Sequence, residues 1–133
     1  MYEFKIECHC MKIQCSFALP ATTVVQCHCQ NCRKMQGSDY STWLAIIREQ
    51  FSIDAGRQFI TEYQINERSS KSFCSFCGTV VCAINGKHFN EHLMVPLGVV
   101  KNYSPDLEPR LQVYVTNKAE WVQIHDGVNV LDK

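Results

Sequence analysis

The chain has 133 residues, of which 46% are hydrophobic and 20% are charged, a composition typical of a globular protein and not of a disordered one. Thirteen basic residues balance thirteen acidic ones, so the net charge gives no sign of nucleic acid or of an anionic membrane as a partner. The longest nearly apolar run, residues 93–100, is too short to cross a bilayer.

The amino-terminal residues lack the basic and apolar regions of a signal peptide. We therefore expect a soluble, cytoplasmic protein, with the nucleus as an alternative, and no membrane partner. The length suits one domain with its own core, which we expect to occupy residues 1–133. The sequence does not predict the oligomeric state.

Short strands are predicted along most of the chain. Alternating apolar and polar residues predict strands in five places, at residues 4–8, 13–17, 58–65, 79–84 and 111–116. Residues rich in β-branched or aromatic side chains favour two more, at 22–26 and 40–47. The sequence therefore predicts a mainly β fold, built of antiparallel sheets.

Helix and tight turns are predicted in few places. One or two helical turns are expected at residues 30–35, and another at 118–122. Asn85-Gly86 is the best hairpin turn in the chain, because both residues tolerate a positive φ angle. The aromatic side chains, Trp43 and Trp121 among them, are expected to pack in the core.

Seven of the nine cysteines fall into three clusters. These are a C-x-C at Cys8 and Cys10, a C-x-C-x-x-C at Cys27, Cys29 and Cys32, and a C-x-x-C-G at Cys74, Cys77 and Gly78. Residues two apart on a strand share one face, and residues three apart reach one ion when the chain turns between them. Clustered thiols in a reducing compartment favour a metal over disulfides, and zinc is the metal that prefers thiolate ligands.

Seven ligands cannot complete two tetrahedral sites, which need eight. One arrangement gives a closed site with four sulfurs and an open site with three, and open sites bind water or substrate. Cys27, Cys29 and Cys32 lie within six residues and could form the open site unaided. Spacing alone leaves this division unproved.

The remaining cysteines and the histidines have other expected roles. Cys15 and Cys82 stand alone in strand-like segments and are interpreted as small core residues. His9 and His28 each lie between two cysteines, so they should point away from a metal. Residues 88–92 match the zinc-protease pattern H-x-x-E-H, but Gly86 and Pro96 flank it in a β-like region, so we interpret the match as chance.

The order and surroundings of the clusters resemble the family of glutathione-dependent formaldehyde-activating enzymes, which includes centromere protein V. Beyond the first C-x-C, the motifs that carry the resemblance are C-H-C-x-x-C-R-K at residues 27–34, F-C-x-x-C-G-T at 73–79, and a tail with Lys118-Ala119, Trp121 and Asp126-Gly127. The resemblance covers about residues 7–127. One departure is visible, because Met11 stands where the family usually has glycine.

The resemblance implies antiparallel β-sheets pinned by two zinc ions per chain. It places Cys8, Cys10, Cys74 and Cys77 at a structural zinc, and Cys27, Cys29 and Cys32 at a catalytic zinc. The implied activity is that of a carbon–sulfur lyase, which adds glutathione or a related small thiol to formaldehyde and gives S-hydroxymethylglutathione.

Two questions remain open at the level of sequence. The alternative function is a non-enzymatic zinc module that binds protein partners, as centromere protein V suggests, although this chain has no long basic extension. For an enzyme, the carboxylates of glutathione require basic side chains near the metal. The candidates are Arg33, Lys34, Arg48, Arg57, Arg68 and Lys71.

Overall fold

The computed structural model describes residues 3–102, 104–125 and 127–131. Its strands are β1 (Glu3–Glu7), β2 (Gln14–Ala18), β3 (Thr23–Cys27), β4 (Ser41–Ile47), β5 (Phe51–Ala55), β6 (Ile60–Gln64), β7 (Ser69–Cys74), β8 (Val80–Asn85), β9 (His92–Pro96), β10 (Leu111–Val113) and β11 (Asn129–Leu131). The α-helix of the described chain is α1 (Gln30–Gln36), and short 3-10 turns occupy Arg48–Gln50, Arg57–Phe59, Leu97–Val99, Pro105–Leu107 and Val115–Asn117. The mainly β prediction is confirmed.

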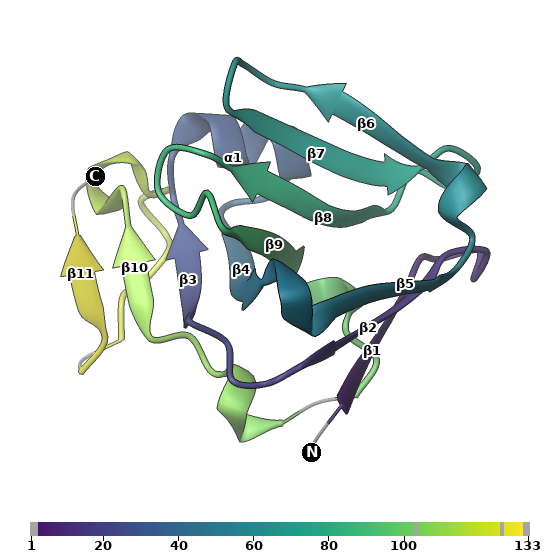
Figure 1. Ribbon diagram of the computed structural model, residues 1–133. Helices are drawn as coiled ribbons and strands as arrows, with labels where there is room; N and C mark the ends of the chain where they lie inside the picture. The colour runs from purple at the N-terminus through teal and green to yellow at the C-terminus, as the bar shows by residue number, and fades with distance from the viewer. Residues whose placement is uncertain (1–2, 103, 126, 132–133) are drawn as a thin grey trace.

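The strands form two sheets (Figure 1). The smaller sheet has the order β1-β2-β5, and the larger has the order β11-β10-β3-β4-β9-β8-β7-β6. Most neighbours are antiparallel, but β10 pairs in parallel with both β3 and β11. The larger sheet therefore brings together strands from both ends of the chain, and β3, which carries the first cysteine of the C-x-C-x-x-C motif, lies among its inner strands.

Two apolar clusters fill the interior. The larger joins the two sheets through Phe4, whose ring stacks on Phe17 with centroids 5.3 Å apart, and through Leu44 and Val95. The smaller contains Val25, Trp43 and Met94, with Cys27 beside them. Burial alternates on β1, where Phe4 and Ile6 point to the same side of the strand, whereas three successive residues of β2, Cys15, Ser16 and Phe17, are all buried.

Several predicted elements were misplaced. Residues 118–122 form turns and no helix; the nearest helical turn is Val115–Asn117. Trp121 is 71% exposed, because its indole N–H donates to Asp39 Oδ2 at the surface over 2.8 Å, whereas Trp43 is buried as expected. Asp126 of the tail motif lies outside the described residues.

The turn at Asn85-Gly86 also differs from expectation. Strands β8 and β9 do pair antiparallel, but residues 86–91 connect them, and Gly86 has no positive φ angle. Instead, Asn85 Oδ1 accepts the backbone N–H groups of Lys87 and His88. A Cβ atom at Gly86 would lie 2.5 Å from the carbonyl oxygen of Arg68, so close backbone approach is what requires glycine there.

Candidate metal centre

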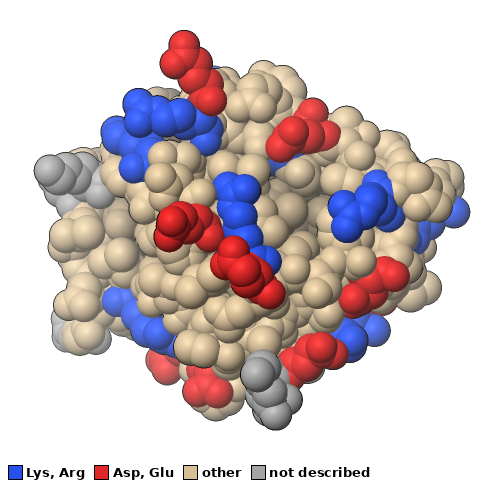
Figure 2. Space-filling model, viewed as in Figure 1, with Lys and Arg blue, Asp and Glu red and all other residues tan. Residues whose placement is uncertain are grey.

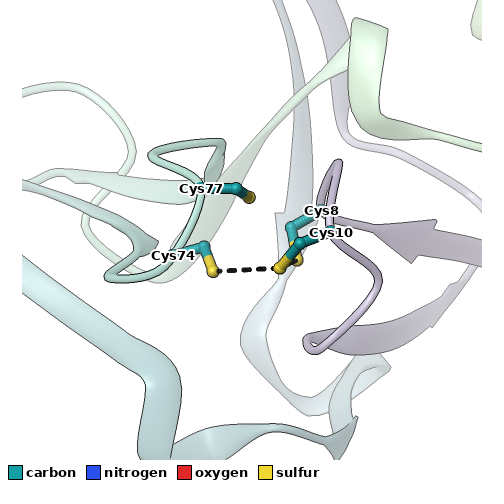
Figure 3. Close-up of side chains that lie close together, drawn as sticks. All are labelled: Cys8, Cys10, Cys74 and Cys77. Atoms are coloured by element: carbon teal, nitrogen blue, oxygen red, sulfur yellow. Dashed lines mark hydrogen bonds between the residues drawn. The ribbon is translucent and has the colours of Figure 1, made fainter.

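Two loops bring four thiols together at the junction of the two sheets. Cys8 and Cys10 lie in the connection between β1 and β2, while Cys74 and Cys77 come from the end of β7 and the loop before β8 (Figure 3). Their sulfur atoms all lie within 4.8 Å of one another. This cluster, here called the four-thiol cluster, joins segments more than sixty residues apart in the chain.

The sulfur spacing fits a tetrahedral metal site. Sulfurs at about 2.3 Å from zinc stand roughly 3.8 Å apart in a regular tetrahedron. Cys8 Sγ lies 3.6 Å from Cys10 Sγ, and Cys10 Sγ lies 3.7 Å from Cys74 Sγ. The four-thiol cluster could therefore hold a metal ion without rearrangement of its loops.

Backbone and side-chain groups hold these sulfurs in place. The N–H of Ile13 donates to Cys8 Sγ over 3.3 Å, and the N–H of Gly78 donates to the carbonyl of Cys74 over 2.8 Å. The hydroxyl and the backbone N–H of Thr79 lower the pKa of Cys77 to about 5. A thiolate is thus favoured at Cys77, and thiolate is the form that binds metal.

A second group, here called the three-thiol cluster, is formed within one short segment. Cys27 ends β3, Cys29 caps the amino end of α1, and Cys32 lies in its first turn. Cys29 Sγ accepts the N–H of Cys32 over 3.3 Å, the hydrogen bond expected of a cap residue. The three sulfurs also lie within 4.8 Å of one another, so this cluster could hold a metal with three protein ligands.

The proximity of these sulfurs changes their acidity. Hydrogen bonds from Cys27 and then Cys32 lower the pKa of Cys29, and the hydrogen bonds that Cys27 shares with Cys29 and Cys32 raise the pKa of Cys27. Burial, followed by the charges of the same three cysteines, raises the pKa of Tyr114. Without metal, the cluster is thus a partly protonated group, and metal binding would release protons from it.

The three-thiol cluster lies in the wall of a cavity of about 770 Å³. Its apolar wall includes Val25, Trp43, Phe89, Met94, Leu111, Val113 and Tyr114. Basic and amide side chains contribute as well, among them Asn66, Arg68, Lys71 and Lys87. The four-thiol cluster does not line this cavity, so the two clusters differ in access as well as in ligand number.

As expected, no histidine among the described residues belongs to either cysteine cluster. His9 is exposed, and His28 is fully buried, with its Nε2 2.6 Å from Gln112 Oε1. His88 and His92 share no helix, and His92 Nε2 lies 2.8 Å from Thr22 Oγ1. Neither belongs to a metal-ready group among the described residues, which agrees with a chance match to the protease pattern.

Most of the basic candidates are directed elsewhere. Arg33 donates to the carbonyl of Asn117, and Arg48 donates to that of Asn90. Of the six side chains considered from the sequence, the cavity is lined by Arg68 and Lys71 alone. The sequence missed Lys87, Phe89 and Tyr114, because no spacing signal connects residues that separate strands bring to one cavity.

Basic and acidic side chains lie among one another on one face of the molecule (Figure 2). Figure 2 shows both signs interspersed on one face, without a large basic area. Among the described residues, no helix is long and apolar enough to cross a membrane.

Comparison with known proteins identifies relatives at the level of family and fold. No curated protein matches the chain. The crystal structure of a Rhodobacter sphaeroides protein, a structural-genomics target, is similar with a TM-score of 0.64 and 19% sequence identity, over 76% of this chain and 91% of the other. A family model described as glutathione-dependent formaldehyde-activating enzyme matches residues 3–117. The chain therefore belongs to the family of glutathione-dependent formaldehyde-activating enzymes.

Proposed function

We propose that this protein is a zinc-dependent carbon–sulfur lyase that joins glutathione, or a related small thiol, to formaldehyde and gives S-hydroxymethylglutathione. The observation that carries the proposal is the opening of the three-thiol cluster onto a 770 Å³ cavity, while the four-thiol cluster has no such access. Family membership supports chemistry that involves glutathione and formaldehyde. In this proposal Cys8, Cys10, Cys74 and Cys77 hold a structural zinc.

The three-thiol cluster supplies the ligands of the reactive centre. Zinc bound to Cys27, Cys29 and Cys32 would supply an open coordination position at which a substrate thiol loses its proton. Three thiolates are soft ligands that suit zinc. The buried Cys27 and the cap geometry of Cys29 hold the sulfurs in place, and since all three cysteines line the cavity, a metal held by them would be accessible from it.

The reaction itself retains all atoms of both substrates. The thiol sulfur forms a bond to the formaldehyde carbon, the C=O π bond breaks, and the carbonyl oxygen takes up a proton. Tyr114 lines the cavity beside the three thiols; a phenol is protonated at neutral pH, and burial, which raises the pKa of Tyr114, further favours that form. We assign to the Tyr114 hydroxyl the hydrogen bond that stabilises the developing charge on that oxygen.

A pair of cysteine substitutions tests the division of labour. Cys29→Ser should remove one of two zinc ions per chain and abolish catalysed exchange between formaldehyde and S-hydroxymethylglutathione, while the fold persists. Cys74→Ser should unfold the protein, because Cys74 is fully buried at the junction of the sheets. Elemental analysis measures the zinc content, thermal unfolding measures the stability of the fold, and magnetisation-exchange NMR measures the rate of exchange.

Two results would contradict this function. One is that Cys29→Ser unfolds the chain as severely as Cys74→Ser, which would make both clusters structural. The other is that zinc-loaded protein does not accelerate the exchange above the uncatalysed rate but retains a stable protein partner, which would favour the non-enzymatic zinc module.

A further inference from the structure

The cavity wall contains a half-buried lysine that has no acidic partner. Lys71 lies in β7, and its Nζ donates to the carbonyl of Met35 over 3.2 Å. Over residues 3–102, 104–125 and 127–131, the ion pairs are Lys5–Glu3 and Lys101–Glu7, and neither includes Lys71. An ammonium group has three donors; one bonds the Met35 carbonyl, Nζ also lies 5.9 Å from the centroid of the Phe73 ring, and at least one donor stays available for an anion.

The charge around Lys71 is not balanced by the rest of the cavity wall. Besides Lys71, the cavity wall contains the cationic side chains of Arg68 and Lys87 and the acidic side chain of Glu67. Arg68, Lys87 and Glu67 are exposed, whereas Lys71 is half-buried. A partly desolvated cation is costly without a counter-charge, so a bound anion would be stabilised here more than at the exposed rim.

The position of Lys71 relative to the three-thiol cluster follows from helix α1. Met35 lies six residues after Cys29, which is about 9 Å along a helix at 1.5 Å per residue. The Lys71 ammonium group, which donates to the Met35 carbonyl, therefore lies roughly 9 Å or more from Cys29 along the helix axis. An extended residue spans roughly 3.5 Å, so a thiol with two or three residues reaches from one group to the other, and a two-carbon thiol does not.

We propose that Lys71 binds a carboxylate of the thiol substrate and thereby selects peptide-sized anionic thiols over small neutral ones. This inference rests on the proposed function of the same cavity and names the residue that sets its substrate class. The sulfur end faces Cys27, Cys29 and Cys32, the carboxylate meets the Lys71 ammonium, and the apolar wall at Trp43 and Phe89 contacts the body of the ligand.

The test uses ligands without a free thiol. S-methylglutathione carries both carboxylates, and its diethyl ester carries neither, so the pair isolates the charge. Their binding is measured by fluorescence of Trp43 in the cavity wall, in a Trp121→Phe background that removes the exposed indole. Lys71→Gln should weaken binding of S-methylglutathione about tenfold, the loss typical of one charge-assisted hydrogen bond.

The controls separate loss of charge from loss of structure. Binding of the diethyl ester should not change in Lys71→Gln, and Lys71→Arg should restore most of the affinity for S-methylglutathione. Lys34→Gln removes an exposed lysine of α1 that does not line the cavity, so it should change neither ligand's affinity. With glutathione as substrate, Lys71→Gln should raise KM about tenfold and leave kcat unchanged.

Three results would overturn the assignment. The first is failure of the unsubstituted protein to bind S-methylglutathione at millimolar concentration. The second is an equal loss of affinity for S-methylglutathione and for its diethyl ester in Lys71→Gln. The third is a fall in the zinc content of Lys71→Gln with no change in its affinity for either ligand. Failure of the proposed lyase activity is distinguishable, because S-methylglutathione binding that depends on Lys71 would then persist without catalysed exchange.

Discussion

Met11 adopts a left-handed backbone conformation, with φ of 68°, directly after the first C-x-C motif. The family usually has glycine there, and the structure gives the reason: the N–H of Met11 closes a tight turn on the carbonyl of Cys8 over 2.9 Å. The side chain is 61% exposed and contributes little packing. The departure from the family pattern thus leaves the turn and its cysteines in place, at the cost of backbone strain.

Met11→Gly should raise the free energy of unfolding by about 0.5–1 kcal/mol. Relief of the left-handed strain exceeds the added entropy of glycine in the unfolded chain. Urea denaturation measures the change. The matched control is Met35→Gly in α1, where helical geometry favours methionine and a loss of about 1 kcal/mol is expected. A loss of stability at both positions would show that Met11 is not strained.

Cys15 belongs to the interior of the smaller sheet and binds no proposed metal. Its side chain is 1% exposed, and burial raises the pKa of its thiol from 9.0 to about 12. Between pH 9.0 and about pH 12 the Cys15 thiol of the folded protein keeps a proton that the same thiol releases in the unfolded chain. Stability from this group is therefore fully present below pH 9 and is lost as the pH rises toward 12.

The free energy of unfolding should consequently fall less steeply above pH 9 in Cys15→Ala than in the unsubstituted protein. Guanidinium denaturation at several pH values, with zinc in excess, measures both slopes. Cys82→Ala gives a comparison. Burial raises the pKa of Cys82 to about 11, so the stability that this thiol contributes is lost at a lower pH than that of Cys15. Parallel curves for the unsubstituted protein and Cys15→Ala would contradict the role of this thiol.

At the scale of elements, a buried chain of polar groups connects β10, β3 and β4. Gln112 Oε1 of β10 accepts a hydrogen bond from His28 Nε2 over 2.6 Å, and Gln112 Nε2 donates to Gln26 Oε1. Gln26 Nε2 in turn donates to Thr42 Oγ1 over 3.1 Å. Since His28 lies between two cysteines of the three-thiol cluster, this polar chain fixes the segment that presents them.

Gln112→Leu should lower the free energy of unfolding by about 1–3 kcal/mol, because it leaves buried polar atoms of His28 and Gln26 without partners. Zinc affinity of the three-thiol cluster should fall as well, since its segment is less constrained. Denaturant unfolding and zinc competition measure these effects. The control is Gln123→Leu at an exposed position. It should change neither the free energy of unfolding nor the free energy of zinc binding by more than about 0.5 kcal/mol.

At the scale of the whole molecule, the four-thiol cluster joins the small sheet to the large one. Cys8 and Cys10 follow β1, Cys74 ends β7 and Cys77 lies in the loop before β8, so a metal there would fasten both sheets. Apolar contacts such as Phe4 on Phe17 lie in the same junction. A metal held there would therefore add its ligand bonds to the apolar packing that joins the two sheets.

Removal of metal by a strong chelator should occur in two steps. The three-thiol cluster, which opens onto the cavity, should lose its ion first with little change in circular dichroism. Loss of the second ion should coincide with unfolding. Metal release followed with a chromogenic chelator, beside circular dichroism, gives the order; loss of both ions in one unfolding step would contradict it.

Local patterns predicted most of the early strands. Alternation over residues 4–8 and 13–17 marks β1 and β2, and the helical turns expected at residues 30–35 agree with α1 to within one residue at its end. Strands β5, β7, β9 and β11 were missed; Ser69–Cys74 of β7 is rich in serine, and the three exposed residues of β11 carry no periodic signal. Those strands form through pairing with partners already in the sheet, a nonlocal effect that overrides weak local preference.

The amino-acid sequence by itself determined that Cys27, Cys29 and Cys32 lie close enough along the chain to share one ion, because only six residues span them. Only the tertiary structure decided that Cys8 and Cys10 meet Cys74 and Cys77, and that Lys71 and Tyr114 share a cavity with the three-thiol cluster. The physical reason is distance along the chain: side chains on separate strands become neighbours only through sheet register and packing, which no local spacing encodes.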